Sequence, residues 1–136
     1  MKKKLAFILI CLAILGCKNK EVQGIIIGDT LLVLQSYSEN KELCHLIERA
    51  LNKDSEALVG LINFPCGGAA GCYDVGYIVS QLVYRIGEHE FIQMTSKLTK
   101  QQQIEIRNYI EVGLEYGHNN LKIEHEFPEL DKILKG

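Results

Sequence analysis

Two cysteines flank a glycine-rich segment, which is the most unusual local feature of the 136-residue sequence. Cys66 and Cys72 enclose five residues, Gly67-Gly-Ala-Ala-Gly71, and this segment is flexible enough to let the two sulfurs bond. A phosphate-binding loop would end in Gly-Lys-Ser or Gly-Lys-Thr, and neither is present. We expect a Cys66–Cys72 disulfide with Cys44 buried as a small apolar side chain. A pairing of Cys44 with either of the other two is the alternative.

A loop closed in this way has two interpretations. It could insert into the cleft of a partner, because a disulfide lowers the conformational entropy that a loop loses on binding. The residues that would then contact the partner are Gly67, Gly68, Gly71, Tyr73 and Asp74. The other interpretation is a tight connection between two helices, in which the glycines permit close packing. That connection is the more usual role for such a segment.

The remaining polar residues do not form a recognisable metal site or catalytic set. Cys44 and His45 are adjacent on a predicted helix and point to different sides of it, whereas structural zinc ligands come in pairs two to four residues apart. A cysteine nucleophile needs a histidine base nearby. Four histidines are present, all in polar surroundings typical of a surface: His45, His89, His118 and His125. We therefore predict no metal, no cofactor and no catalytic residue, and a binding protein rather than an enzyme.

The N-terminal segment has the order of an export signal. Three lysines at positions 2–4 precede the apolar run Leu5–Leu15, which is followed by Gly16 and Cys17. The apolar run is too short to cross a membrane, because a spanning helix needs about 20 residues. Residues 1–16 are therefore predicted to be a cleaved signal peptide.

The segment Ile14-Leu15-Gly16-Cys17 resembles the lipobox of bacterial lipoproteins, where a small residue precedes the cysteine that becomes the acylated N-terminus. Leu15 is bulkier than the residue usual at its position. The resemblance covers the leader alone and implies a lipid on Cys17, which would hold the protein to a membrane of the cell envelope on its periplasmic or surface face. Two or more acyl chains give a stable anchor. Residues 17–24 are expected to be the lipidated N-terminus and a short tether.

Removal of the leader changes the charge of the chain. The remaining 120 residues fit one domain, and they carry twelve basic and seventeen acidic side chains, a formal charge of −5. This balance argues against a nucleic-acid-binding protein, which needs a basic face. The sequence contains no tryptophan, which argues against a carbohydrate site built on an indole ring. An exported chain also meets an oxidising compartment, which favours a disulfide.

Hydrophobic periodicity predicts helices through most of residues 25–136. The residues from Tyr73 to Ile86 are apolar nearly all round, which places them at the centre of the core. The other expected helices cover residues 40–52, 54–62, 88–97, 99–116 and 128–134. Residues 25–34 could form either a hairpin around Gly28-Asp29 or a helix begun by Asp29 or Thr30, and the helix is slightly favoured. The predicted fold is an all-α compact bundle of about six short helices or helical hairpins in a single domain.

These observations favour a membrane-anchored protein-binding module. Its sharper form is an immunity or inhibitor protein that neutralises a secreted toxin or lytic enzyme. A structural or assembly lipoprotein of the envelope is the first alternative, and it would show a broad exposed apolar patch. A cysteine-dependent envelope hydrolase is the second alternative. It would need Cys66 or Cys72 as a free thiol, so a disulfide between them would exclude it.

Overall fold

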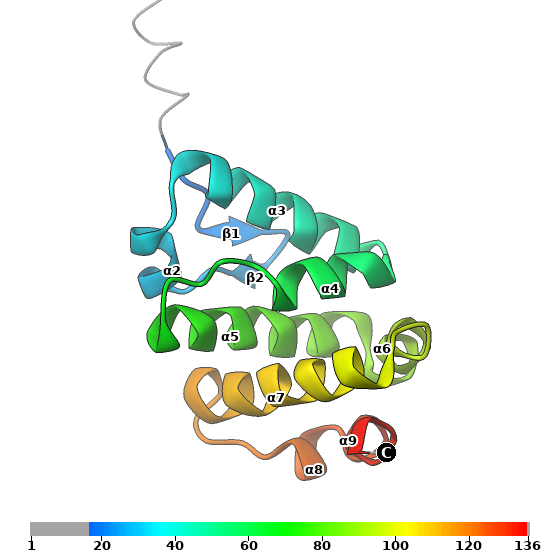
Figure 1. Cartoon of the computed structure of the whole chain (residues 1–136). Coiled ribbons are helices and arrows are strands. Elements are labelled where there is room, and N and C mark those ends of the chain that lie inside the picture. Colours follow the sequence, from blue (N-terminus) through cyan, green and yellow to red (C-terminus); the bar gives the residue numbers. More distant parts are fainter. Residues whose placement is uncertain (1–16, 136) are drawn as a thin grey trace, which may run out of the picture.

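Helices dominate the computed structural model, which describes residues 17–135 (Figure 1). The predicted signal peptide, residues 1–16, lies outside the described residues. A two-stranded hairpin is followed by eight helices in this part of the chain, so the predicted all-α bundle is confirmed. The elements are β1 (Glu21–Val22), β2 (Ile25–Ile26), α2 (Asp29–Leu34), α3 (Tyr37–Leu51), α4 (Ser55–Ile62), α5 (Ala69–Ile86), α6 (Glu88–Thr95), α7 (Lys100–Gly117), α8 (Ile123–Glu126) and α9 (Pro128–Lys135).

The elements form layers around α5, which has the central place that its all-round apolar sequence predicts. Helix α3 and the hairpin lie on one side of α5, and α7 lies antiparallel to α5 on the other side (Figure 1). Helices α8 and α9 cover the outer side of α7, farthest from α3. Five apolar side chains of α5 have no exposed surface: Val75, Ile78, Val79, Leu82 and Val83.

Two glycines allow α5 and α7 to approach closely. Gly76 of α5 and Gly113 of α7 are both buried where the two helices cross. A Cβ on Gly76 would lie 2.6 Å from the carbonyl oxygen of Tyr109, and a Cβ on Gly113 would overlap the Gly76 carbonyl. The backbones of the two longest helices therefore touch directly, with no side chain between them.

The helix boundaries follow local capping signals. Thr99 and Gln102 form the predicted capping box of α7, and the Asp54 side chain caps α4 as predicted. Helix α3 begins three residues earlier than predicted, because Ser36 and Glu39 form a second capping box. Helix α5 begins at Ala69 instead of Tyr73, since the second half of the glycine-rich segment forms its first turn.

The N-terminal residues differ from the tether that we expected. Residues 21–26 form the hairpin β1–β2, which turns at Gln23 and Gly24, both with positive φ. Val22 and Ile25 are buried, and the Gln81 side chain of α5 holds the backbone of Ile26 through bonds of 2.8 and 2.9 Å. The two alternatives for residues 25–34 are each partly right. Residues 25–26 are a strand, but they pair with residues 21–22 and not with residues beyond Gly28. Helix α2 begins at Asp29.

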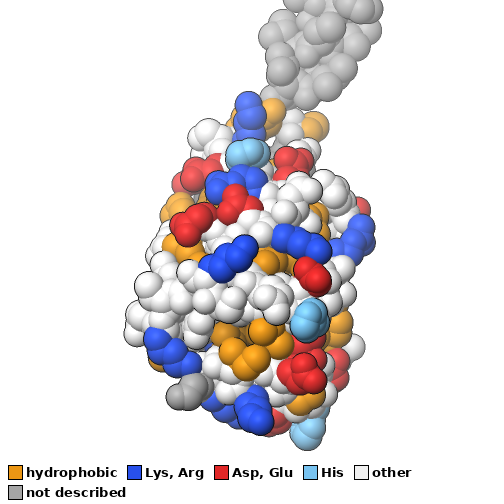
Figure 2. Space-filling view, turned by 90° about the vertical axis from the view of Figure 1, so that its right-hand side faces the viewer, with side chains coloured by type: hydrophobic (Ala, Val, Ile, Leu, Met, Phe, Trp, Pro, Cys, Tyr) orange, Lys and Arg blue, Asp and Glu red, His pale blue; other side chains and the backbone are white. Residues whose placement is uncertain are grey.

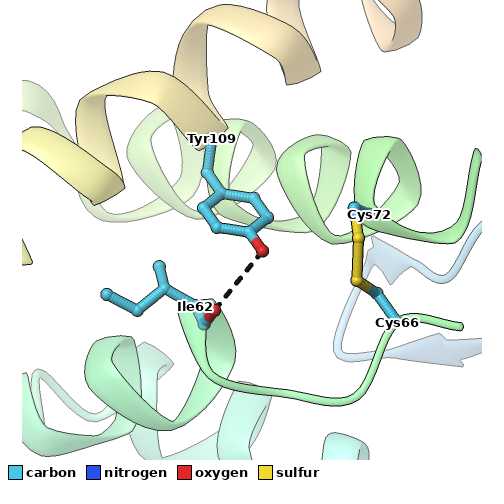
Figure 3. Close-up of a disulfide and its surroundings, with 4 residues drawn as sticks. All are labelled: Ile62, Cys66, Cys72 and Tyr109. Atoms are coloured by element: carbon cyan, nitrogen blue, oxygen red, sulfur yellow. Dashed lines mark hydrogen bonds between the residues drawn. A yellow bond between two sulfur atoms is a disulfide. The ribbon is translucent and has the colours of Figure 1, made fainter. Parts of the chain in front are cut away.

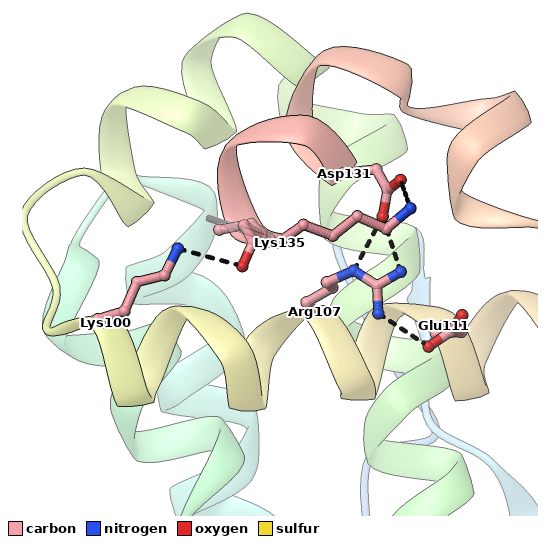
Figure 4. A network of polar contacts seen from close by, with 6 residues as sticks. Lys100, Arg107, Glu111, Asp131 and Lys135 are labelled. Atoms are coloured by element: carbon pink, nitrogen blue, oxygen red, sulfur yellow. Dashed lines mark hydrogen bonds and ion pairs between the residues drawn. The ribbon is translucent and has the colours of Figure 1, made fainter.

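A buried ion pair attaches the C-terminal helix. Asp131 of α9 is 4% exposed and accepts from the Arg107 guanidinium of α7 at 2.8 Å and from Lys135 at 2.6 Å (Figure 4). Arg107 also reaches Glu111 at 3.1 Å. Burial alone would raise the pKa of Asp131, but the hydrogen bonds and charges of Lys135 and Arg107 outweigh it and lower the pKa.

Candidate functional site

The predicted disulfide is confirmed. Cys66 and Cys72 are bonded with their Cα atoms 4.9 Å apart, and the bond fastens the α4–α5 connection to the first turn of α5 (Figure 3). The alternative pairings with Cys44 are wrong, since Cys44 is a free, buried cysteine of α3. Burial raises the pKa of the Cys44 thiol, against a weaker opposing effect of Asn19, so this thiol stays protonated at neutral pH.

The glycine-rich loop does not protrude. Gly67 and Gly68 carry its turn with φ values of +72° and +137°, which favour glycine. The loop lies against α2, because a Cβ on Gly67 would be 3.0 Å from the Leu34 side chain. Gly71 is buried in the first turn of α5, with no room for a Cβ beside the Cys66 carbonyl. Residues 66–72 thus form a tight connection between α4 and α5, and residues 67–70 of it are exposed.

Asp74, one of the five residues proposed to contact a partner, already has a structural partner. Its carboxylate accepts from the backbone N–H of Leu31 at 2.8 Å and so caps the N-terminus of α2. Gly28 makes this possible, because a Cβ there would overlap the carboxylate. The structure therefore leaves Gly67, Gly68 and Tyr73 as the accessible members of the predicted set, with Gly71 and Asp74 used inside the fold.

Tyr73 forms an aromatic stack with a residue that sequence reasoning did not select. Its ring lies parallel to that of Tyr116, at the end of α7, with the centroids 4.4 Å apart and the planes 3° from parallel. Tyr116 is 61% exposed. The neighbouring Glu115 carboxylate and Tyr73 raise the pKa of Tyr116, so its hydroxyl stays protonated. The stack presents a rigid aromatic surface next to the disulfide.

Helix α2 extends this surface with aliphatic side chains. Val33 is 79% exposed and Leu34 is 51% exposed, and Leu34 lies over the glycines of the loop. We call this combined surface the disulfide face, made of Val33, Leu34, residues 66–70, Tyr73 and Tyr116. The signal in the sequence was the run Leu31-Leu-Val-Leu34, because one face of a short helix cannot bury four consecutive apolar residues.

Two clefts border the disulfide face at Tyr73, and charged side chains lie beside it. The first cleft, of about 190 Å³, is lined by Cys72, Tyr73, Asn108, Tyr109 and Val112. The second, of about 280 Å³, is lined by Gly28, Tyr73, Asp74, Tyr77, Tyr116 and Gly117. Asp29 and Glu115 are exposed beside this surface, and the Lys18 ammonium lies at its α2 side, where it donates to the Leu32 carbonyl at 2.6 Å. The opposite end of the molecule mixes charges of both signs with apolar side chains (Figure 2).

A second hollow surrounds His118, which is not the surface histidine that the sequence predicts. The hollow has a volume of about 430 Å³ and is lined by Gly24, Ile25, Gln81, Tyr84, Arg85 and His118. Partial burial lowers the pKa of His118, whose Nε2 lies 3.1 Å from Ser80 Oγ. Ser80 is fully buried and its hydroxyl donates to the Tyr77 carbonyl at 2.8 Å. This serine is therefore a structural acceptor for the histidine and cannot reach a substrate.

Between residues 17 and 135, the side chains of His, Cys, Asp and Glu nowhere gather in a group of three or more that could hold a metal ion. Of the described helices, none has the length and apolarity required to cross a membrane.

Comparison with protein-family models, curated proteins and solved structures finds no match to this chain.

Proposed function

We propose that the protein is a lipid-anchored envelope protein that binds a protein partner through the disulfide face and acts as an immunity or inhibitor protein against a secreted toxin or lytic enzyme. The observations that carry this proposal are the exposure of Val33, Leu34 and Tyr116, the packing of Leu34 against Gly67 and Gly71, and the stacking of Tyr116 on Tyr73, the residue after Cys72. A contiguous exposed apolar patch marks an interaction site, and tyrosine is enriched in the cores of protein interfaces.

The rigidity of the disulfide face supports binding. The Cys66–Cys72 bond, the cap that Asp74 provides to α2 and the Tyr73–Tyr116 stack hold the surface in one arrangement. A surface ordered in advance loses less conformational entropy on association. The exposed carboxylates of Asp29 and Glu115 favour basic side chains at the matching positions of a partner, whereas Lys18 at the α2 side favours an acidic one there.

The chemistry of the cysteines argues against the hydrolase alternative. The disulfide leaves neither Cys66 nor Cys72 as a thiol, and Cys44 is a buried thiol with a raised pKa. A nucleophilic cysteine instead needs a lowered pKa and access to substrate.

A structural or assembly lipoprotein is the second candidate function. It is favoured by the breadth of the disulfide face, which spans α2, the α4–α5 connection and the end of α7 and does not project as one loop. An assembly protein would contact resident envelope proteins through this face. An inhibitor would contact one secreted enzyme.

The binding proposal is tested with Val33→Asp on the disulfide face and Ile133→Asp on α9 as the matched control, because both replace an exposed aliphatic side chain with a charge. The candidate partner is a secreted basic hydrolase encoded by a neighbouring gene. We expect the parent protein and Ile133→Asp to protect cells that express this enzyme in the envelope. Val33→Asp should protect poorly, with at least about tenfold weaker binding to the purified enzyme.

Equal protection by Val33→Asp and the parent would contradict the proposed surface. If neither protects, cross-linking in intact cells separates the two candidates. An assembly lipoprotein should be cross-linked to resident envelope proteins, and Val33→Asp should lose these products while Ile133→Asp keeps them.

The anchor is tested separately. Intact-mass measurement should show acylation at Cys17, and the mass should rise by about 2 Da on reduction, from one disulfide. A Cys17→Ala variant that still fractionates with membranes would contradict the lipid anchor.

A further inference from the structure

The chain is attached to the folded domain almost directly after Cys17. The Lys18 ammonium donates to the Leu32 carbonyl at 2.6 Å. The backbone N–H of Asn19 donates to Asn40 Oδ1 at 2.7 Å, and the Asn40 amide returns a bond of 3.0 Å to the Asn19 carbonyl. Asn40 belongs to α3 and is 2% exposed, so this reciprocal pair is anchored in the domain.

Further contacts hold the segment after Cys17 to the domain through the hairpin. The backbone N–H of Ile27 donates to the Lys20 carbonyl at 2.9 Å, and Val22 is buried. A chain extends at most about 3.6 Å per residue. Cys17 therefore cannot move more than one or two residue lengths from the domain surface without breaking these bonds.

Cys17 also borders a cleft between the N-terminal segment and α3. This cleft has a volume of about 350 Å³, and its lining includes Cys17, Asn19, Tyr37, Lys41, His45 and Glu48. Six α3 residues line it in all: Asn40 and Cys44 are buried at its floor, whereas Tyr37, Lys41, His45 and Glu48 follow one another at helical spacing and are exposed. A group carried on Cys17 would thus lie against this face of α3.

From this attachment we infer that the lipidated protein lies on the bilayer in a fixed orientation, with the outer face of α3 against the lipid headgroups and helices α8 and α9 pointing away. The inference rests on the proposed acylation of Cys17. The surface that the α3 face contacts is then the same membrane that holds the acyl chains. Tyr37 is 48% exposed there, and tyrosine is enriched where protein meets the membrane interface.

This orientation deepens the proposed binding function. In Figure 1 the described chain begins on the α3 side, whereas α2, the start of α5 and the end of α7 meet at one end of the layers. With α3 on the bilayer, the disulfide face stands upright beside the membrane. A partner then reaches it laterally, close to the lipid surface.

The test uses the full chain, processed in cells, purified and inserted into phosphatidylcholine vesicles. Hydroxyl-radical footprinting compares it with a variant that carries about ten Gly and Ser residues between Cys17 and Lys18. Such a linker has a root-mean-square length of roughly 17 Å and keeps every docking bond of the domain. Because the vesicles are neutral, attraction of lysines to anionic lipid plays no part.

We expect Tyr37 and His45 to be oxidised several-fold more slowly in the parent than in the linker variant. Tyr116 and His125, which are also exposed, should be oxidised equally in both and serve as residue-matched controls. A second variant, Asn40→Ala, removes both bonds to Asn19 and should give intermediate protection of Tyr37.

Equal oxidation of Tyr37 and His45 in the parent and the linker variant would overturn the fixed orientation, even if both proteins float with the vesicles. Failure to float, with no acyl mass on the N-terminal peptide, would overturn the anchor and the orientation together. Neither result depends on the effect of Val33→Asp on partner binding, so the two proposals fail separately.

Discussion

Gly76 on α5 and Gly113 on α7 place the backbones of the two helices in direct contact, with the Gly113 Cα facing the Gly76 carbonyl. Helix α5 is the centre of the layers, and α7 is the helix on which α9 docks. This crossing therefore sets the spacing of the whole bundle. It also brings the start of α5, with Tyr73, next to the end of α7, with Tyr116.

Substitution of Gly113 by alanine should destabilise the protein by about 3 kcal/mol, because the added methyl must push the two helices apart. The sign of this change in the free energy of unfolding is informative, since Gly→Ala inside a helix without such a contact stabilises by about 1 kcal/mol. Urea unfolding followed by circular dichroism measures the change. Asn108→Ala, at an exposed position of the same helix, should stay within about 0.5 kcal/mol of the parent. A stabilised Gly113→Ala variant would show that the contact is not tight.

Loss of the Asp74 carboxylate should loosen α2 selectively. Asp74→Ala removes the acceptor of the Leu31 N–H bond, and a lost helix cap costs about 1 kcal/mol. Hydrogen exchange should accelerate at Leu31 and Leu32 while the amides of α7 keep their rates. Thr30→Ala, on the exposed side of α2, is the control and should leave the exchange of Leu31 unchanged. Unaltered exchange in Asp74→Ala would mean that α2 does not depend on this cap.

Replacement of both Cys66 and Cys72 by serine should lower the free energy of unfolding by about 2 kcal/mol, as the chain-entropy model gives for a loop this short. The fold should persist, because Leu34 still packs on the loop and the core of α5 is unaffected. Hydrogen exchange should rise in residues 63–72. An unfolded double variant would indicate that the disulfide is essential for folding, contrary to this expectation.

Acid should weaken the attachment of α9. The pKa of Asp131 is lowered in the folded protein, so its ion pairs stabilise the fold fully above the unfolded value near 3.8 and progressively less as the pH falls through the folded value. Asp131→Asn should therefore cost about 2–3 kcal/mol at pH 7, and the difference from the parent should shrink below about pH 4.

The control for this experiment is Glu111→Gln, which removes the more exposed partner of Arg107. It should change the stability at pH 7 by less than about 1 kcal/mol. A cost of Asp131→Asn that stays constant between pH 3 and pH 7 would contradict the role assigned to the carboxylate charge.

The parts of the fold that sequence could predict are those determined by neighbouring residues. The Thr99–Gln102 capping box, the Asp54 cap and the buried run of α5 are local patterns, and the structure has all three. The Cys66–Cys72 bond was also accessible, because five intervening residues rich in glycine allow the sulfurs to meet.

The errors concern residues whose partners are far away in the chain. The sequence predicts a tether at the hairpin, since the contact of Ile26 with Gln81 spans 55 residues and no local pattern reveals it. It likewise predicts a binding role for Asp74, since the bond to Leu31 spans 43 residues. The disulfide face likewise needs α2 and the end of α7 to meet at the start of α5. No local sequence pattern encodes these contacts between helices. The run of four apolar residues in α2 does indicate that some of those four side chains are exposed.

The hairpin also affects the order in which the protein can fold. A two-stranded hairpin of this length is not stable alone. Its support comes from Gln81 in α5, which is made only after more than half of the chain has been synthesised. The residues that leave the ribosome first are therefore among the last to settle. Until α5 is made, the hairpin lacks the support of Gln81.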